Sequence, residues 1–221
     1  MRVVLAQVAS PPVFSLLIEA VGINVISHYQ REPVWRPKRQ LYNINLAPSL
    51  ANWLFDPASL TERIIEACDG RFSVRVLRQG WTFPMLNEAR TLKMRRGSYA
   101  LVRQVHLLCN DQPWVFARTV IPPKTLRGKQ RRLARLGQKP LGALLFADKS
   151  MQRTEMEIAR IQPGQQMYQL ATYHQAQQQQ PIWGRRSVFY LNHRPLLVSE
   201  IFLPTVGEPV HRSLGSINNI L

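Results

Sequence analysis

Cysteine is scarce in this chain of 221 residues, where only Cys68 and Cys109 occur, and their spacing is not that of a zinc site. Two isolated cysteines favour reduced thiols in a cytoplasmic setting, although they also allow a single disulfide. No stretch reaches the roughly 18 consecutive apolar residues of a membrane-spanning helix. Gln7 interrupts the short apolar run at the N-terminus before it reaches the length of a signal peptide. We therefore expect a soluble, cytoplasmic protein without a bound metal.

Acidic residues are also few, with 13 Asp and Glu against 29 Lys and Arg, so the formal net charge is +16. Such a charge favours anionic partners, whether nucleic acid, an acidic membrane surface or a small polyanion. The sequence contains no nucleophile elbow, phosphate-binding glycine loop or dinucleotide fingerprint. Any chemistry must therefore use few groups and no recognisable cofactor.

Length and a hydrophobic content of 45% fit one folded domain with a sizeable core. Residues 1–45 are mixed in character, and we interpret them as a loosely packed, poorly ordered extension or as an upstream region included by a misjudged start. The domain itself is expected over residues 46–207. Within it, residues 162–180 are rich in glutamine and predict a flexible surface insertion, and residues 208–221 form a C-terminal tail.

Helix and strand signals follow one another from residue 48 onward. Pro48 and Ser49 open a short helix, and Asp56 with Pro57 predicts the N-cap and first residue of a second helix, which Gly70 stops. Asn110 and Asp111 predict a hairpin turn between two runs of strand-forming residues. Strands are expected over residues 72–77, 99–108, 114–121 and 154–161.

The segment from Lys124 to Lys139 carries many cations and no acid, with leucines at near-helical spacing. It predicts a basic amphipathic helix that binds phosphates or an anionic membrane, although a solvated face is the commoner explanation of such a run. No aromatic residues are interleaved to stack bases. A nucleic-acid-binding protein is therefore kept only as an alternative, beside a peripheral membrane contact through this segment.

The stretch from Trp183 to Pro204 predicts a second hairpin, with its turn at residues 192–194. Glu200 is the only charge within its second strand, and it shares one face with Val198 and Phe202. An unpaired buried carboxylate is costly or becomes protonated. Glu200 is therefore either a site residue or half of a buried ion pair.

Arg103 lies on the more apolar face of the strand over residues 99–108, together with Leu101, Val105 and Leu107. Two strands thus each carry one charge among large hydrophobic residues, and the two charges have opposite sign. A structural ion pair between Arg103 and Glu200 and a ligand site that uses both residues are both open on this pattern.

Six segments, in order, resemble the chorismate pyruvate-lyase family. They are WLFDPASLTER at 53–63, Val102-Arg103, PWVFARTVIP at 113–122, LGQKPLGALLF at 136–146, WGRRS at 183–187 and PLLVSEIFLP at 195–204. The resemblance implies an α+β fold in which helices pack on a six-stranded antiparallel sheet and cover an internal ligand site. It also implies an enzyme that eliminates pyruvate from chorismate, giving 4-hydroxybenzoate for ubiquinone biosynthesis. We expect this enzyme to be a monomer without a cofactor.

The same resemblance implies roles for four residues. Arg103 would hold the ring carboxylate, assisted by backbone groups at Leu141 next to Gly142. Glu200 would face the ring 4-oxygen, and Leu60 would line the apolar pocket. Arg103 and Glu200 are thus the expected catalytic residues, and no residue is expected to bind a metal.

A non-catalytic alternative shares this fold, because the ligand-sensing domain of some transcription regulators binds small molecules without transforming them. Those regulators carry a winged helix-turn-helix ahead of the sensor. Residues 1–47 show neither the length nor the repeated helical pattern of such a module. The sequence therefore favours the enzyme over the sensor.

Overall fold

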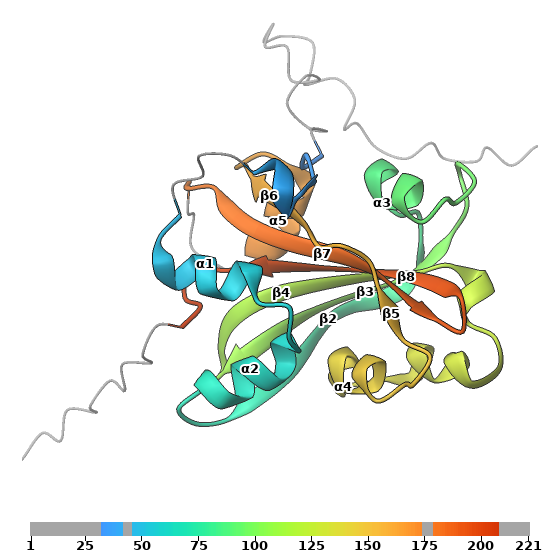
Figure 1. Cartoon of the computed structure of the whole chain (residues 1–221), viewed down its shortest axis with the longest axis horizontal. Helices are drawn as coiled ribbons and strands as arrows, with labels where there is room; N and C mark the ends of the chain where they lie inside the picture. The colour runs from blue at the N-terminus through green and yellow to red at the C-terminus, as the bar shows by residue number, and fades with distance from the viewer. Residues whose placement is uncertain (1–31, 42–45, 174–178, 208–221) are drawn as a thin grey trace, which may run out of the picture.

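The computed structural model describes residues 32–41, 46–173 and 179–207. These residues form one eight-stranded antiparallel sheet with helices on both faces, which confirms the expected α+β architecture (Figure 1). Two strands, β1 (Arg36–Pro37) and β5 (Gln152–Arg153), have only 2 residues each. The remaining strands account for the six that were expected, so the difference in strand number comes from these two short pairings.

The sheet has the strand order β1-β6-β7-β8-β4-β3-β2, and β5 pairs with one end of β7. The longer strands are β2 (Phe72–Thr82), β3 (Ala100–Cys109), β4 (Gln112–Ile121), β6 (Glu157–Ile161), β7 (Ile182–Leu191) and β8 (Arg194–Phe202). The α-helices are α1 (Pro48–Phe55), α2 (Leu60–Ala67), α3 (Leu86–Thr91), α4 (Leu141–Phe146) and α5 (Gln166–Thr172). Short 3-10 helices are η2 (Lys38–Gln40), η3 (Pro123–Thr125) and η4 (Gly128–Arg135).

Two tight turns set the register of the central strands. Asn110 and Asp111 have φ of 48° and 65°, and Asn192 and His193 have φ of 47° and 62°. Two successive residues with positive φ are typical of the type I′ turns that join hairpin strands. Both predicted hairpins are therefore confirmed, β3 with β4 and β7 with β8.

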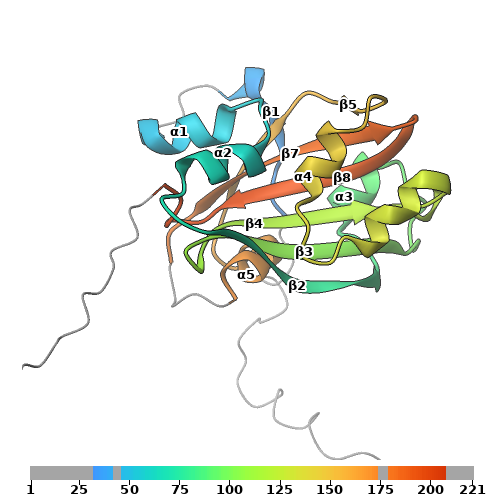
Figure 2. The same ribbon diagram turned by 90° about the horizontal axis from the view of Figure 1, so that it is seen from below.

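Because side chains alternate along each strand, the sheet has two faces with separate cores. The near face, which we define as the face of Arg103 and Glu200, packs against α1 and α2 at one end and against η4 and α4 at the other. The opposite, far face packs against α5 and the segment that follows α3. Figure 2 shows α2 and α4 in front of the sheet and α3 and α5 behind it.

The second helix begins later than the sequence predicts. Its N-cap is Ser59, whose hydroxyl accepts a hydrogen bond from the Glu62 amide at 3.4 Å. Asp56 instead follows the last residue of α1, and its side chain accepts from the Ala58 amide at 2.8 Å. The predicted N-cap at Asp56 is therefore wrong, because this carboxylate closes the loop between two helices.

The basic segment from Lys124 to Lys139 is not an amphipathic α-helix. It contains the end of the 3-10 helix η3 and the whole of η4. Gly128, with φ of 57°, is the first residue of η4, and Gly137, with φ of 55°, follows its C-cap. Leu133 and Leu136 are nevertheless buried, so the predicted apolar side of the segment does face the core. The glycines and the preceding prolines prevent a continuous helix here.

The glutamine-rich segment is more ordered than predicted. Residues 166–172 form α5, which buries Met167, Tyr168 and Ala171 against Phe116 and Ile201 on the far face. The expectation of a flexible surface insertion is thus wrong for the helix, because every third or fourth residue of it is apolar. Residues 174–178 lie outside the described part of the chain.

Part of the expected N-terminal extension contacts the domain. The Glu32 carboxylate accepts hydrogen bonds from the amides of Leu86 and Asn87 at 2.7 and 2.8 Å, and β1 pairs with β6. Trp35 is buried on the far face. The other residues of the expected extension, 1–31 and 42–45, and the tail from 208 onward lie outside the described residues.

Cys68 and Cys109 form a disulfide that joins the end of α2 to the end of β3. The sequence favoured reduced thiols, so that interpretation is wrong and its alternative, a single disulfide, is found. The two residues are 41 positions apart. No local motif could have indicated the pairing, which follows from α2 lying over the near face.

Candidate active site

A cavity of about 50 Å³ lies on the near face, beneath α2 and the start of α4. Three of the predicted site residues, Arg103, Leu141 and Glu200, line it. Leu60 is not among its lining residues; it is buried in the core between α1 and α2, and its neighbour Thr61 lines the cavity instead. The remaining walls are Val74, Val105, Leu107, Ala117, Thr119, Pro140, Gly142, Leu145, Phe189 and Val198.

Arg103 lies at one end of this cavity and is only 2% exposed. Its guanidinium donates to the carbonyl oxygens of Gly137 at 2.8 Å and Lys139 at 3.3 Å, and to the side-chain oxygen of Gln79 at 3.3 Å. Among the described residues, no carboxylate lies within ion-pair distance of it. Burial lowers the pKa of Arg103, yet a guanidinium remains charged at neutral pH. This end of the cavity therefore presents a buried cation without an anion.

The start of α4 forms part of the roof over Arg103. Leu141 and Gly142 are its first residues, and amide groups in the first turn of a helix have no acceptor within the helix. A Cβ atom at Gly142 would lie 3.0 Å from the Thr61 hydroxyl oxygen, so a glycine here lets α4 approach α2 closely. The roof can thus offer backbone N–H groups to an anion bound near Arg103.

Glu200 occupies the other end of the cavity and is held by Arg185. Arg185 Nε donates to Glu200 Oε2 at 2.6 Å, and its Nη1 donates to the carbonyl oxygens of Trp53, at 3.2 Å, and Asp56. Glu200 Oε1 accepts no hydrogen bond from the described residues. One carboxylate oxygen is therefore fixed by the protein, and the other is available to a ligand.

The structural ion pair between Arg103 and Glu200 that the sequence allowed is absent from the described residues. Arg103 is paired in register with Thr119 on β4, whereas Glu200 is paired with Ala117 of the same strand. Strands lie ~4.8 Å apart and rise ~3.3 Å per residue, so the two Cα atoms are about 12 Å apart. The structural-pair hypothesis is wrong for these residues, which face one cavity from opposite ends.

Arg185 and Arg153 are part of this region and were not predicted from the sequence. Alternation along a strand puts Arg185 and Arg186 on opposite faces, but the pattern does not say which of the two faces the cavity. In the structure Arg186 pairs with Glu157 at 2.7 Å on the far face, so Arg185 lies on the cavity side. For Arg153 no signal was visible, since it lies on a two-residue strand.

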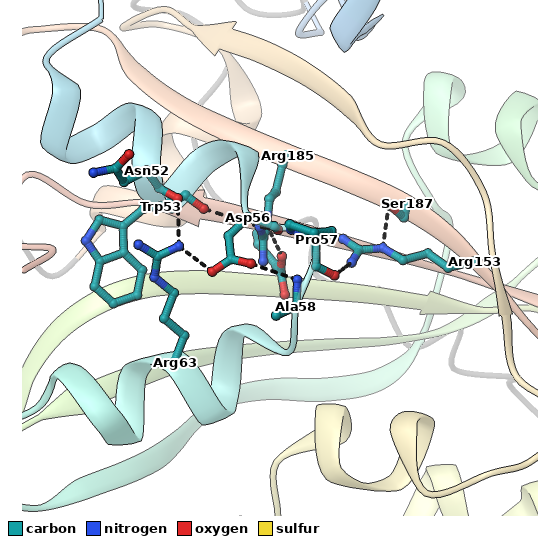
Figure 3. Close-up of polar contacts among 10 residues, drawn as sticks. Asn52, Trp53, Asp56, Pro57, Ala58, Arg63, Arg153, Arg185 and Ser187 are labelled. Carbon is teal, nitrogen blue, oxygen red and sulfur yellow. Dashed lines mark hydrogen bonds and ion pairs between the residues drawn. The ribbon is translucent and has the colours of Figure 1, made fainter.

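Arginines also hold the loop between α1 and α2 in place, Arg153 from the sheet and Arg63 from α2 (Figure 3). Arg63 Nη1 donates to the Asn52 carbonyl at 2.6 Å and to the Asp56 carboxylate. Arg153 donates to the Pro57 carbonyl at 2.8 Å and to the Ser187 hydroxyl at 3.0 Å. Burial acts to raise the pKa of Asp56, but the hydrogen bond from Ala58 and the charge of Arg63 outweigh it, so this pKa is lowered.

A larger surface groove, of about 470 Å³, lies beside α3 on the other side of the sheet and contains none of the predicted site residues. Within the described ranges, no group of three or more His, Cys, Asp and Glu residues is arranged to hold a metal ion. Nor does this part of the chain contain a helix long and apolar enough to cross a membrane. The near-face cavity is therefore the candidate site.

The site is thus a cavity on the sheet of an α+β domain, with a buried cation at one end and a fixed carboxylate at the other. The chain belongs to the chorismate lyase family, whose model matches residues 30–210.

Two relatives, both named probable chorismate pyruvate-lyase, are similar over most of their length. The protein from Methylococcus capsulatus is 43% identical over 157 residues, which cover 71% of this chain and 96% of the relative. The protein from Azoarcus sp. is 45% identical over 161 residues, covering 71% and 85%. Among solved structures, the C-terminal domain of the histidine utilization repressor from Pseudomonas syringae is 14% identical, with a TM-score of 0.46 over 64% of this chain and 98% of that one.

Proposed function

We propose that this protein is a chorismate pyruvate-lyase, which eliminates pyruvate from chorismate and leaves 4-hydroxybenzoate. The observation that carries the proposal is the placement of two charges at opposite ends of one cavity. Arg103 is a buried cation without an anion, and Glu200 is a carboxylate held in place by Arg185. This arrangement suits a ring that has a carboxylate at one end and an oxygen at the other. The names of the relatives support the same activity.

In the proposed complex, the Arg103 guanidinium binds the ring carboxylate, and the amides of Leu141 and Gly142 assist it. Glu200 Oε1 faces the ring 4-hydroxyl while Arg185 holds Oε2. Leu60 was expected to line the pocket; because it lies in the core between α1 and α2, the role proposed for it here is to support α2 and the Thr61 wall. The ring is thereby fixed at both ends, in the conformer that reacts.

The reaction breaks the bond between the ether oxygen and the ring carbon that carries the enolpyruvyl group. A proton leaves the neighbouring ring carbon, which bears the hydroxyl, and the electron pair of that C–H bond completes the aromatic ring. The departing enolpyruvate takes up a proton and becomes pyruvate. Aromatisation drives the step, so the protein needs only to orient the ring and stabilise developing charge in a site with little water.

We further propose the setting in which this activity operates. The enzyme acts as a cytoplasmic monomer, without metal, cofactor or obligate nucleic acid, and supplies 4-hydroxybenzoate to ubiquinone biosynthesis. The cations of the segment from Lys124 to Lys139 give it a peripheral contact with anionic membranes. The disulfide between Cys68 and Cys109 does not favour the cytoplasmic location in this proposal, because stable disulfides are commoner in oxidising compartments than in the cytoplasm.

The test is to incubate the purified protein with chorismate, with and without EDTA, and to measure both products. We expect 4-hydroxybenzoate and pyruvate in equal amounts, at a rate that EDTA does not change. Tight binding of 4-hydroxybenzoate without any turnover of chorismate would contradict the lyase and support a ligand-sensing protein. Loss of turnover with EDTA, restored by a divalent ion, would contradict the metal-free mechanism.

A further inference from the structure

Arg103 and Glu200 together do not account for both negative charges of the proposed substrate. Arg103 meets one carboxylate of the proposed substrate, but chorismate carries a second carboxylate on its enolpyruvyl group. Glu200 cannot bind it, because like charges repel. The site therefore needs a second cation near the Glu200 end.

Arg153 is a cation near the Glu200 end of the cavity. Its guanidinium carbon lies 5.1 Å from the centroid of the Phe189 ring, and Phe189 lines the cavity. It also donates to Ser187, which is paired in register with Val198, another lining residue. Arg153 is thus one side chain away from the cavity wall, on the strand that extends the sheet beside β7.

The hydrogen bonds of Arg153 do not neutralise its charge. Nε donates to Ser187 and Nη1 donates to the Pro57 carbonyl, and both acceptors are neutral. Among the described residues, Nη2 has no hydrogen-bond acceptor, and no carboxylate lies within ion-pair distance of the guanidinium. Burial lowers the pKa of Arg153, and the nearby charge of Glu200 acts in the opposite direction. The Glu200 carboxylate therefore acts on Arg153 through its electrostatic field without forming an ion pair with it.

Arg185 is the other cation at this end, and its charge is already paired with Glu200. It is 1% exposed, its Nε bonds Glu200, and its Nη1 bonds two backbone carbonyls of the loop after α1. Moving it to a ligand would release Glu200. Arg153 can bind an anion without that loss.

We propose that Arg153 forms a second carboxylate subsite, which binds the enolpyruvyl carboxylate of the substrate. This inference rests on the proposed function, because it assigns the second anion of the same ligand. The enolpyruvyl ether is attached to the ring carbon next to the one that bears the hydroxyl. With the ring carboxylate at Arg103 and the hydroxyl at Glu200, its carboxylate extends past Glu200 toward β5 and β7.

The subsite gives substrate and product different contacts. Chorismate uses Arg103 and Arg153, whereas 4-hydroxybenzoate has one carboxylate and uses Arg103 alone. As the ether bond breaks, the departing enolpyruvate gains negative charge, and Arg153 stabilises it. Arg153 therefore selects the substrate and assists the leaving group, without contributing to product affinity.

The test compares two stable aromatic ligands on variants of the full chain. 4-Hydroxybenzoate lacks the second anion, and 3-carboxymethoxy-4-hydroxybenzoate carries an ether-linked carboxylate at the position of the enolpyruvyl group. Calorimetric titration of both ligands is carried out on the wild type, Arg153→Gln, Arg153→Lys and Arg63→Gln. Arg63→Gln is the matched control, because Arg63 ties down the same loop through Asp56.

We expect Arg153→Gln to weaken binding of the dicarboxylate by about 10- to 100-fold, the worth of one charged hydrogen bond, while leaving 4-hydroxybenzoate affinity within about twofold. Arg153→Lys should recover part of the loss, and Arg63→Gln should leave the ratio of the two affinities unchanged. In turnover assays, Arg153→Gln should raise KM for chorismate and lower kcat.

Equal weakening of both ligands in Arg153→Gln would reduce Arg153 to an anchor for the loop and overturn the subsite. An unchanged dicarboxylate affinity in Arg153→Gln would also overturn it. Because both ligands are tested by binding, these outcomes are separate from failure of the proposed function, which appears as a wild type that binds them but does not convert chorismate.

Discussion

The two faces of the sheet use their buried and half-buried arginines in different ways. On the far face, Arg118 donates to both oxygens of Glu88, at 2.7 and 3.0 Å, and Arg186 donates to Glu157 at 2.7 Å. On the near face, Arg185 has Glu200, but among the described residues neither Arg103 nor Arg153 has a carboxylate within ion-pair distance. The same residue type therefore neutralises its charge internally on one face and leaves it uncompensated on the other.

This difference separates structural from functional charge. A buried ion pair whose members satisfy each other adds specificity to a core but offers nothing to a ligand. A buried cation held only by neutral acceptors is stabilised further when an anion arrives. The near face should thus lose function, and the far face stability, when an arginine is neutralised.

The largest effect on function is expected from Arg103→Gln. It removes the cation that binds the ring carboxylate, so kcat/KM should fall by about 100- to 1,000-fold, the worth of a bidentate charged contact. Since no carboxylate is left unpaired, the melting temperature should stay close to that of the wild type. Steady-state kinetics with chorismate and a thermal melt check both expectations. A strongly lowered melting temperature with unchanged kcat/KM would place Arg103 with the far-face arginines.

Glu200→Gln should lower kcat by roughly 100-fold. The amide cannot accept a proton, and it does not place a negative charge beside the ring 4-oxygen. Its oxygen can still accept from Arg185, so the loss of stability should be about 1–2 kcal/mol. Glu157→Gln is the matched control, since it removes the same charge from an arginine pair on the far face. Equal kcat in the two variants would show that Glu200 only supports the fold.

Arg118→Gln should have the largest effect on stability. It leaves the Glu88 carboxylate buried without its cation, at a cost of about 3–5 kcal/mol in the free energy of unfolding. Glu88 would keep one partner, the Met85 amide at 2.8 Å. Denaturant unfolding measures the loss, and kcat/KM assayed well below the melting temperature should be unchanged. A stable but inactive variant would show that the far face takes part in the site.

The smallest effect concerns the loop over the cavity. The folded-state pKa of Asp56 lies below the ordinary value of 3.8, so its carboxylate stabilises the fold above pH 3.8, and this contribution disappears as the pH falls through the folded pKa. Asp56→Asn should therefore lower the melting temperature slightly at pH 6, and the difference from the wild type should shrink as the pH falls below 3.8. A difference that stays constant as the pH falls below 3.8 would mean that the Asp56 charge is not responsible.

The sequence predicted those parts of the fold that depend on local signals. Asn110-Asp111 and Asn192-His193 are turn residues between strand-forming runs, and alternation placed Arg103 and Glu200 on buried faces before any strand order was known. The N-cap predicted at Asp56 is wrong because its carboxylate bonds Arg63, a contact that competes with helix capping. In α5, the glutamines that surround the apolar residues hide their helical spacing.

What could not be predicted depends on the strand order. Arg185 meets Glu200 because β7 lies beside β8, but Glu200 avoids Arg103 because β4 separates β8 from β3. Neither relation follows from the pattern within one strand. The roles of Leu60 and Leu141 came from resemblance alone, and the structure places Leu141 at the cavity and Leu60 behind its wall.

The most direct test of the account is the shift in melting temperature that saturating 4-hydroxybenzoate causes in the wild type, Arg103→Gln and Arg118→Gln. A ligand that binds only the folded state raises the melting temperature whatever the starting stability of the variant. We predict similar upward shifts in the wild type and in Arg118→Gln, and none in Arg103→Gln. An undiminished shift in Arg103→Gln, or its loss in Arg118→Gln, would contradict the assignment of the near face to ligand binding and of the far face to stability.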